Sequence, residues 1–194
     1  MEIEVAPVGP GHLEEYASLP ISFEVRSVLE CVVPQHGLGG IVFVERDLHV
    51  PYVKDYDAIP GEGPLLWPEQ FDTSRWSLFL AREAGEVAGG AAVAFGSAGM
   101  AMLEGRGDLA VLWDIRVARA SRRAGVGSAL FAAACRWSAD QGARELKVET
   151  QNTNVPACRF YESRGCRLGA VNLRACPLLP GEAQLLWYRS LASG

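Results

Sequence analysis

Positive charge is scarce in this sequence of 194 residues. It contains 18 lysines and arginines against 23 aspartates and glutamates, which gives a formal net charge of −5. Proteins that bind nucleic acid depend largely on Lys and Arg contacts with phosphates. We therefore expect no nucleic-acid partner. A mildly acidic surface instead favours ligands that carry positive charge.

Patterns typical of metal ligands are also missing. Histidine occurs only at His12, His36 and His49, and the five cysteines form no C-x-x-C pair. Neither a zinc site nor a Ser-His-Asp arrangement is visible. We expect no metal, and we interpret the cysteines as reduced thiols of a cytoplasmic protein. They are Cys31, Cys135, Cys158, Cys166 and Cys176.

Long apolar runs are absent as well. The longest uncharged stretch, residues 87–103, is 17 residues long and contains four glycines, which is short for a membrane helix. The acidic start Met1-Glu2-Ile3-Glu4 does not fit a signal peptide. We therefore expect no membrane partner. With 49% hydrophobic residues, the sequence predicts a single domain over residues 1–194.

The first 76 residues give a weak pattern. The spacing of Phe23, Val28, Leu29 and Val32 predicts a helix over residues 21–33, followed by an apolar strand over 41–45. Residues 51–76 contain four prolines and form a long connection. Connections of this length are usually either functional lids or poorly ordered, and we favour the lid.

The rest of the chain alternates clearly between strand and helix patterns. One helix is expected over residues 127–141, and a shorter one is expected to begin at the capping residue Asn154. This order predicts an α/β (α+β) protein with a mixed sheet flanked by helices. The predicted strands cover residues 77–81, 87–95, 109–117, 145–150, 168–173 and 183–189.

A glycine-containing turn follows the strand over residues 109–117 and opens the longer helix. Its sequence is Arg122-Arg123-Ala124-Gly125-Val126-Gly127-Ser128. Backbone N–H groups at a helix N-terminus attract anions, and glycine lets a pyrophosphate approach closely. The spacing fits neither a dinucleotide-binding fingerprint nor a P-loop. A plain turn with a helix cap would explain the glycines equally well.

A second motif lies about thirty residues further on, from Asn154 to Gly165. It reads N-x-x-A-x-x-F-Y-x-x-x-G and includes Ala157, Phe160 and Tyr161. Together with R-x-x-G-x-G, it resembles the GNAT superfamily of acetyl-CoA-dependent N-acetyltransferases over about residues 77–190. The run 149–158, Trp187-Tyr188 and the segment 51–56 are most similar to the streptothricin (nourseothricin) acetyltransferases within that superfamily.

The resemblance implies a mostly antiparallel sheet that splays between two adjacent parallel strands, with acetyl-CoA as the cosubstrate. The backbone of Ile115 and Val117 would pair with the pantetheine amides, and Arg116 between them would also belong to the cofactor-binding residues. Arg116 departs from the family, because this strand position is usually apolar. The pyrophosphate would contact Arg122 and the backbone of Arg123, Ala124, Gly125, Val126, Gly127 and Ser128. Asn154, Ala157 and Phe160 would line the cofactor.

The resemblance also assigns catalytic roles. Tyr161 would hydrogen-bond the thioester sulfur and protonate the leaving thiolate. A base must deprotonate the attacking amine, and Asp114 is the first candidate and Glu149 the second. Because strand alternation leaves the direction of Asp114 open, an outward-facing or salt-bridged carboxylate is an equal alternative.

Residues 1–76 would then form the acceptor side, with Tyr52, Asp55, Tyr56 and Asp57 in contact with the substrate. The resulting hypothesis is acetyl transfer to a primary amine of a small cationic molecule, such as a streptothricin-type antibiotic. Another small amine, a peptide amine, or a non-catalytic acyl-CoA-binding module are the alternatives. We expect a monomer or a homodimer.

Overall fold

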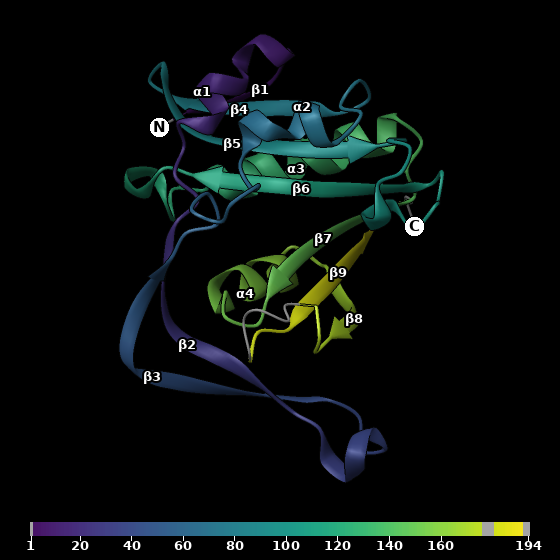
Figure 1. The fold of residues 1–194 in the computed structure, drawn as a ribbon. Helices are drawn as coiled ribbons and strands as arrows, with labels where there is room; N and C mark the ends of the chain where they lie inside the picture. The colour runs from purple at the N-terminus through teal and green to yellow at the C-terminus, as the bar shows by residue number, and fades with distance from the viewer. Residues whose placement is uncertain (1, 176–180, 192–194) are drawn as a thin grey trace. The chain divides into compact units, whose positions relative to one another are not determined.

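The computed structural model describes residues 2–175 and 181–191. It contains a seven-stranded sheet in the order β1-β4-β5-β6-β7-β9-β8 and a two-stranded sheet, β2-β3 (Figure 1). This confirms the mixed, mostly antiparallel sheet with the parallel pair β6–β7. The strands are β1 (Ile3–Val8), β2 (Phe23–Val32), β3 (Val42–Lys54), β4 (Ser77–Glu83), β5 (Glu86–Phe95), β6 (Leu109–Val117), β7 (Glu145–Gln151), β8 (Arg167–Asn172) and β9 (Gln184–Ser190).

The chain forms two compact units. The first comprises Met1–Ser22, Asp55–Lys147 and Ser190–Gly194, and the second comprises Phe23–Lys54 and Val148–Arg189. The single domain over residues 1–194 stays a prediction. The α-helices are α1 (Leu13–Ala17), α2 (Trp67–Gln70), α3 (Val126–Asp140) and α4 (Val155–Ser163), and short 3₁₀ helices cover Pro10–His12, Pro34–Gly37, Pro64–Leu66, Ala101–Leu103 and Arg119–Ser121.

The sheet of the first unit is built around the hairpin of β4 and β5. The turn between these two strands contains Ala84 and Gly85, and both residues have positive φ. Strand β6 pairs antiparallel with β5, and β1 pairs antiparallel with β4. Eight of the ten residues of β5 are buried without alternation, as expected for a strand covered on both faces. The patterns predicted these strands, except β1.

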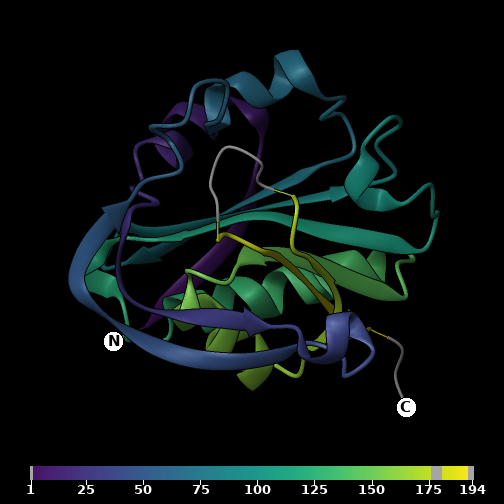
Figure 2. The same ribbon diagram turned by 60° about the horizontal axis from the view of Figure 1, so that its bottom comes forward.

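Two adjacent glycines in β5 show which helices cover each face. A Cβ on Gly89 would lie 2.9 Å from Val126 of α3, whereas a Cβ on Gly90 would lie 2.6 Å from the Tyr16 ring of α1. Since neighbouring strand residues point to opposite faces, α1 and α3 lie on opposite sides of β5 (Figure 2). Both helices approach so closely that these positions have no space for a side chain.

Aromatic side chains attach residues 64–76 to the α1 side of the sheet. Trp67 packs edge-on against Tyr16, and Phe71 packs edge-on against Trp113 of β6 at 4.9 Å between ring centroids. The Trp76 ring centroid lies within 6 Å of those of Trp67, Phe71 and Trp113. The expected long connection is therefore a shorter one, because residues 51–54 belong to β3 and the second half packs as short helices.

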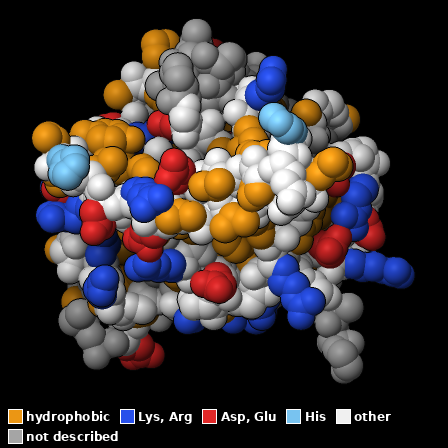
Figure 3. Space-filling view, turned by 90° about the horizontal axis from the view of Figure 1, so that it is seen from below, with side chains coloured by type: hydrophobic (Ala, Val, Ile, Leu, Met, Phe, Trp, Pro, Cys, Tyr) orange, Lys and Arg blue, Asp and Glu red, His pale blue; other side chains and the backbone are white. Residues whose placement is uncertain are grey.

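The second unit corrects the predicted helix over residues 21–33. These residues form β2, which pairs antiparallel with β3 in a long hairpin. Val25, Val28 and Val32 are β-branched and favour a strand, but a register shift between Val25 and Ser27 breaks the simple alternation. The predicted strand over residues 41–45 is the start of the longer β3. Large apolar side chains of this hairpin are exposed, including Leu38, Val50 and Val53, and the face in Figure 3 mixes apolar side chains with charges of both signs.

The remainder of the second unit follows the predicted order of strand, helix, strand and strand. Asn152 connects the end of β7 to the hairpin, because its Nδ2 donates to the Leu29 carbonyl at 2.9 Å. The Leu29 N–H donates back to the Asn152 carbonyl, and the Ala183 N–H donates to Asn152 Oδ1 at 2.8 Å. One buried amide thus satisfies backbone groups of two neighbouring segments within this unit.

Candidate active site

A β-bulge interrupts β6 just before its predicted site residues. Ala92 of β5 is opposite Asp114, but the next residue, Val93, is opposite Leu112, which leaves Trp113 as the extra residue. Bulges re-aim side chains and are common beside active sites. Trp113 packs with the cluster around Tyr16, and Asp114 bonds to Tyr16 as well. Two consecutive side chains therefore lie on the α1 face.

Asp114 is a paired carboxylate. The Tyr16 hydroxyl donates to Asp114 Oδ1 at 2.5 Å, and Arg116 Nε donates to the same oxygen at 2.9 Å. The Asp114 side chain is 8% exposed. Burial, followed by the charge of Asp114 and its hydrogen bond, raises the pKa of Tyr16 well above its usual value. The salt-bridged alternative for Asp114 is thus the arrangement that is present.

Arg116 joins this carboxylate to the segment that follows β3. Its Nη1 donates to Asp57 Oδ2 at 2.6 Å, and its Nη2 donates to Asp57 Oδ1 at 2.9 Å. Burial disfavours the charged form of Arg116, but the bonds to Asp57 and Asp114 outweigh it and raise its pKa. Asp55 Oδ1 accepts the Asp57 N–H. The structure therefore brings Asp57, Asp114 and Arg116 together, although the sequence assigned them to different tasks.

The predicted anion-binding turn leads directly into the N-terminus of α3. Arg123 and Gly125 have φ values of 68° and 95°, and Gly125 immediately precedes α3. The first N–H groups of such a helix have no acceptor within it. Ala124 and Gly125 are exposed, whereas Val126 is buried. The turn is thus exposed as far as Gly125, the residue directly before α3.

Arg122 is already engaged in the first unit. Its Nη2 donates to the Ser22 carbonyl at 2.9 Å, and its Nε donates to the Val117 carbonyl at 3.2 Å. Partial burial, and after it the nearby charge of Arg119, lowers the pKa of Arg122. Arg123, on the same turn, is exposed as well.

In the second unit, Glu149 lies between two amides. Gln151 Nε2 donates to Glu149 Oε1 at 3.0 Å, and Gln184 Nε2 of β9 donates to Glu149 Oε2 at 2.7 Å. Next to it, Trp187 Nε1 donates to the Thr150 hydroxyl at 2.9 Å. These contacts hold the second candidate base on β7 in a defined orientation.

The short helix α4 begins as its sequence predicts. The Asn154 side chain accepts the Ala157 N–H at 3.2 Å, and Pro156 occupies the first turn. Near the end of the helix, Phe160 and Tyr161 pack with ring centroids 5.2 Å apart. Tyr161 is 4% exposed and Phe160 is half-buried. Gly165 follows with a φ of 80°.

Tyr52 and Lys54 lie at the end of β3 in the second unit. Lys54 forms a largely buried ion pair with Glu182. Partial burial, and after it the charge of Glu182, raises the pKa of Tyr52. Tyr56, another predicted acceptor residue, follows in the first unit, where it is half-buried.

The predicted residues are therefore divided between the units. The first unit carries Asp57, Asp114, Arg116 and the turn before α3, and the second carries Glu149, Asn154 and Tyr161. Sequence reasoning missed Tyr16 and Gln184. Their partners are distant in the chain, and neither residue belongs to a motif. For the group around Tyr16, the one signal in the sequence was Arg116, an arginine at a strand position that is usually apolar.

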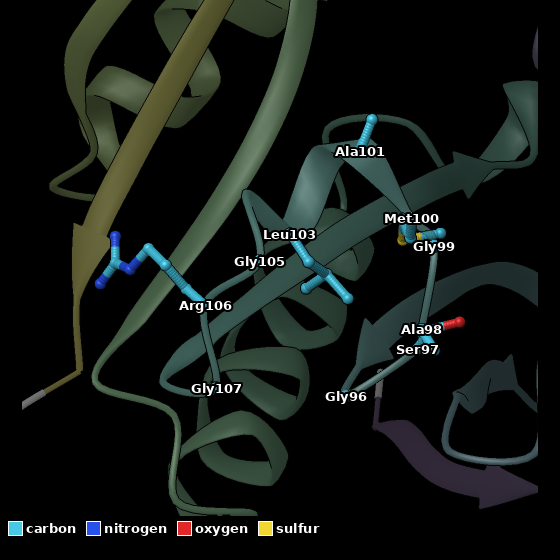
Figure 4. Close-up of a pocket in the computed structure, with 10 residues that line it drawn as sticks. All are labelled: Gly96, Ser97, Ala98, Gly99, Met100, Ala101, Leu103, Gly105, Arg106 and Gly107. Carbon is cyan, nitrogen blue, oxygen red and sulfur yellow. The ribbon is translucent and has the colours of Figure 1, made fainter.

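A cavity of about 430 Å³ lies in the first unit, apart from these residues (Figure 4). Its lining comes from the connection between β5 and β6 and includes Met100, Leu103 and Arg106. Arg106 is paired with Asp108 and Glu145. No predicted site residue contributes to the lining among the residues described.

Residues 2–175 and 181–191 contain no group of three His, Cys, Asp or Glu side chains placed to hold a metal ion. Within the same ranges, every helix is too short or too polar to cross a bilayer. Cys31 and Cys158 are free thiols, and Cys176 lies outside the described residues.

The comparison with known families agrees with this fold. The model of the acetyltransferase (GNAT) family matches residues 44–166, which is more than half of the chain. The chain belongs to the GNAT family.

Two relatives are similar over part of the chain. Streptothricin acetyltransferase A of Bacillus subtilis (strain 168) is 36% identical over 81 residues, 41% of this chain and 47% of the relative. Streptothricin acetyltransferase of Escherichia coli is 33% identical over 84 residues, 42% of this chain and 48% of the relative. The matches thus span about half the length of these relatives.

Solved structures share the fold over almost the whole chain. A nourseothricin acetyltransferase has a TM-score of 0.77 and 23% identity, covering 99% of this chain and 100% of its own. A Bacillus anthracis str. Ames protein in complex with acetyl coenzyme A has a TM-score of 0.76 and 23% identity, covering 98% and 99%. At 23% identity, these similarities show that the chain shares the fold of the two solved structures.

Proposed function

We propose that this protein transfers the acetyl group of acetyl-CoA to a primary amine of a small cationic substrate. The observation that carries the proposal is the turn with positive φ at Arg123 and Gly125, placed between β6 and α3 in a chain of the GNAT family. The partial similarity to two streptothricin acetyltransferases supports a streptothricin-type acceptor. The solved relative with bound acetyl coenzyme A supports the cosubstrate.

In this proposal the backbone holds most of the cosubstrate's pyrophosphate. The N–H groups of residues 123–128 would donate to phosphate oxygens, helped by the positive end of α3. Arg123 would add charge from the exposed turn, while Arg122, engaged with two carbonyls, would support the shape of the turn. Ile115 and Val117 would donate and accept backbone bonds along the pantetheine, with Asn154, Ala157 and Phe160 as further contacts.

The leaving group needs a proton or a strong donor. We assign this role to Tyr161, whose ring is buried beside Phe160. As the amine nitrogen bonds to the acetyl carbon, the C–S bond breaks and the Tyr161 hydroxyl supplies a proton to the departing thiolate. Direct transfer within a ternary complex requires no cysteine nucleophile, and burial raises the pKa of the Cys158 thiol, which disfavours the reactive thiolate.

The amine must lose a proton before it attacks. An alkylamine of pKa ~10.4 lies ~3.4 units above neutral pH, so deprotonation costs ~4.6 kcal/mol. Asp114 is almost fully buried, and its oxygens are already engaged by the Arg116 guanidinium and the Tyr16 hydroxyl. Glu149 accepts bonds from two amides. We therefore place Glu149 ahead of Asp114 as the base, directly or through water.

The acceptor would be recognised by acidic and aromatic side chains near the end of β3. Tyr52, Asp55, Tyr56 and Asp57 are the candidates, and 32% of the Asp57 side chain remains exposed. Cys31 and Cys158 are free thiols, which supports a reducing compartment such as the cytoplasm. Another small amine, a peptide amine, or acyl-CoA binding without catalysis are the competing functions.

The decisive experiment measures release of CoA thiol with a panel of acceptors, namely streptothricin, simple diamines and a lysine-containing peptide. Rapid release with streptothricin and a product heavier by one acetyl group would support the proposal. Glu149→Gln should then lower kcat, whereas Asp114→Asn should affect the acceptor KM more than kcat. Binding of acetyl-CoA without turnover of any amine would favour the non-catalytic module, and absence of CoA binding would exclude both functions.

A further inference from the structure

Arg116 uses every N–H group of its guanidinium. An arginine side chain offers five donors in a fixed planar fork. Nε donates to Asp114, Nη1 donates to Asp57 and to the Leu19 carbonyl, and Nη2 donates to Asp57 and Asp114, all between 2.6 and 3.2 Å. The side chain is 2% exposed. This is a fully satisfied buried cation.

The two carboxylates around it are not equivalent. Asp114 is almost fully buried, with its oxygens bound by Arg116 and Tyr16. Asp57 has about a third of its side chain in solvent, and each of its oxygens accepts one N–H from Arg116. A carboxylate oxygen has room for two donors, so Asp57 retains accepting capacity on its exposed side.

The charges do not balance within this group. One guanidinium faces two carboxylates, which leaves one net negative charge, and only Asp57 is substantially open to water. The Asp57 backbone is also held, because its N–H donates to Asp55 Oδ1 at 3.1 Å. A carboxylate on a connecting segment would ordinarily sample several rotamers. Here a bidentate ion pair fixes both oxygens.

We propose that Arg116 is a positioning residue for the amine acceptor, because it holds the Asp57 carboxylate in one orientation beside Asp114. The proposal rests on the proposed function and deepens it. It explains why an arginine occupies a strand position that is usually apolar in the family, namely to support recognition of the acceptor. Arg116 itself contacts no substrate. It acts through Asp57, and its own positive charge is paired with the two carboxylates.

The test is a double-mutant cycle with steady-state kinetics on Arg116→Lys, Asp57→Asn and the double variant. Lysine keeps the charge but not the planar fork. Each single substitution should raise the KM for streptothricin about tenfold, because this corresponds to the loss of one charge-assisted hydrogen bond. The kcat and the KM for acetyl-CoA should stay near their wild-type values. The double variant should be no worse than Asp57→Asn alone, because Arg116 acts through that carboxylate.

A purely structural role predicts a different result. The two effects would add, the melting temperature would fall, and the KM for acetyl-CoA would change together with that for the acceptor. Arg106→Lys is the matched control, because Arg106 also joins two carboxylates in the first unit, Asp108 and Glu145. This control should leave the acceptor KM unchanged.

Asp57→Glu covers the case in which Arg116→Lys does not fold. It keeps the charge but moves the carboxylate by one methylene group, so positioning predicts a raised acceptor KM, and a wild-type KM overturns the proposal. Calorimetric titration of streptothricin gives a readout independent of turnover. If the wild-type protein acetylates streptothricin but the effects of the two substitutions add in the double-mutant cycle, only the role of Arg116 is overturned. A wild-type protein that neither binds nor acetylates any acceptor overturns the proposed function and the role of Arg116 together.

Discussion

Trp113 and Asp114 are consecutive in β6, yet both side chains lie on the face of the sheet that carries Tyr16. The bulge at Trp113 causes this, because it adds one residue opposite β5 and shifts the alternation from that point onward. Asp114 and Arg116 therefore face the side of α1. Without the bulge, regular alternation would direct them to the side of α3.

The turn before α3 gives the first prediction. Gly125→Val should raise the KM for acetyl-CoA about tenfold, because a branched side chain would block the approach of phosphate to backbone N–H groups. Gly125 has a φ of 95°, so the variant is also strained. Gly142→Val is the control, since Gly142 follows the other end of α3 with a φ of 91° and open space around it. Equal KM values in both folded variants would remove the pyrophosphate from this turn.

Tyr161→Phe should lower kcat while leaving the affinity for acetyl-CoA nearly intact. The ring would still pack beside Phe160, and only the hydroxyl would be lost. A contact made mainly in the transition state affects kcat rather than binding. General-acid assistance is typically worth about a hundredfold or more, and a thiol leaves fairly well unaided, so we expect the low end. Kinetics and a melting curve on the same variant test this, and full activity would remove Tyr161 from catalysis.

Acceptor binding should weaken as salt concentration rises. Exposed charges such as Asp57 are screened over ~10 Å at 0.1 M salt and ~3 Å at 1 M. The KM for a multiply charged amine should therefore increase across this range, and the increase should be smaller for a monoamine and for the Asp57→Asn variant. A salt-independent acceptor KM in the wild-type protein would contradict recognition by carboxylates.

Tyr16→Phe should make the stability less sensitive to alkaline pH. The pKa of Tyr16 in the folded protein is raised above its unfolded value of ~10. Its stabilising contribution is thus complete below pH ~10 and is lost as the pH rises toward the folded-state pKa. At neutral pH the variant should lose about 1–3 kcal/mol with the hydrogen bond to Asp114. Urea unfolding at pH 7 and above pH 10 should show the difference from wild type shrinking, and a constant difference would contradict it.

Local signals predicted much of the fold after residue 77. The cap at Asn154 and the glycines after α3 and α4 marked helix ends that the structure contains. The helix predicted over residues 21–33 was wrong. The register shift between Val25 and Ser27 interrupts the alternation of apolar and polar residues that would have indicated a strand. A bulge is a property of two paired strands, so one strand's sequence does not reveal it.

The candidate site was predictable only as far as its motifs extend. The turn before α3 and the helix carrying Tyr161 are continuous segments with recognisable residues. The group of Tyr16, Asp57, Asp114 and Arg116 joins three segments up to 98 positions apart. Such contacts depend on tertiary packing, and no spacing along the chain encodes them. The order in which we propose Asp114 and Glu149 as the base likewise rests on their partners in the fold, which the sequence does not reveal.

The aromatic cluster on the α1 side of β6 also equips the protein with its own optical reporter. Trp67, Trp76 and Trp113 lie within this cluster, and Trp113 is the residue directly before Asp114. Indole emission depends on the polarity and motion of its surroundings. Any rearrangement of the segment 64–76, or of the bulge itself, should therefore change the intrinsic fluorescence, so acceptor binding could be followed without attaching a dye.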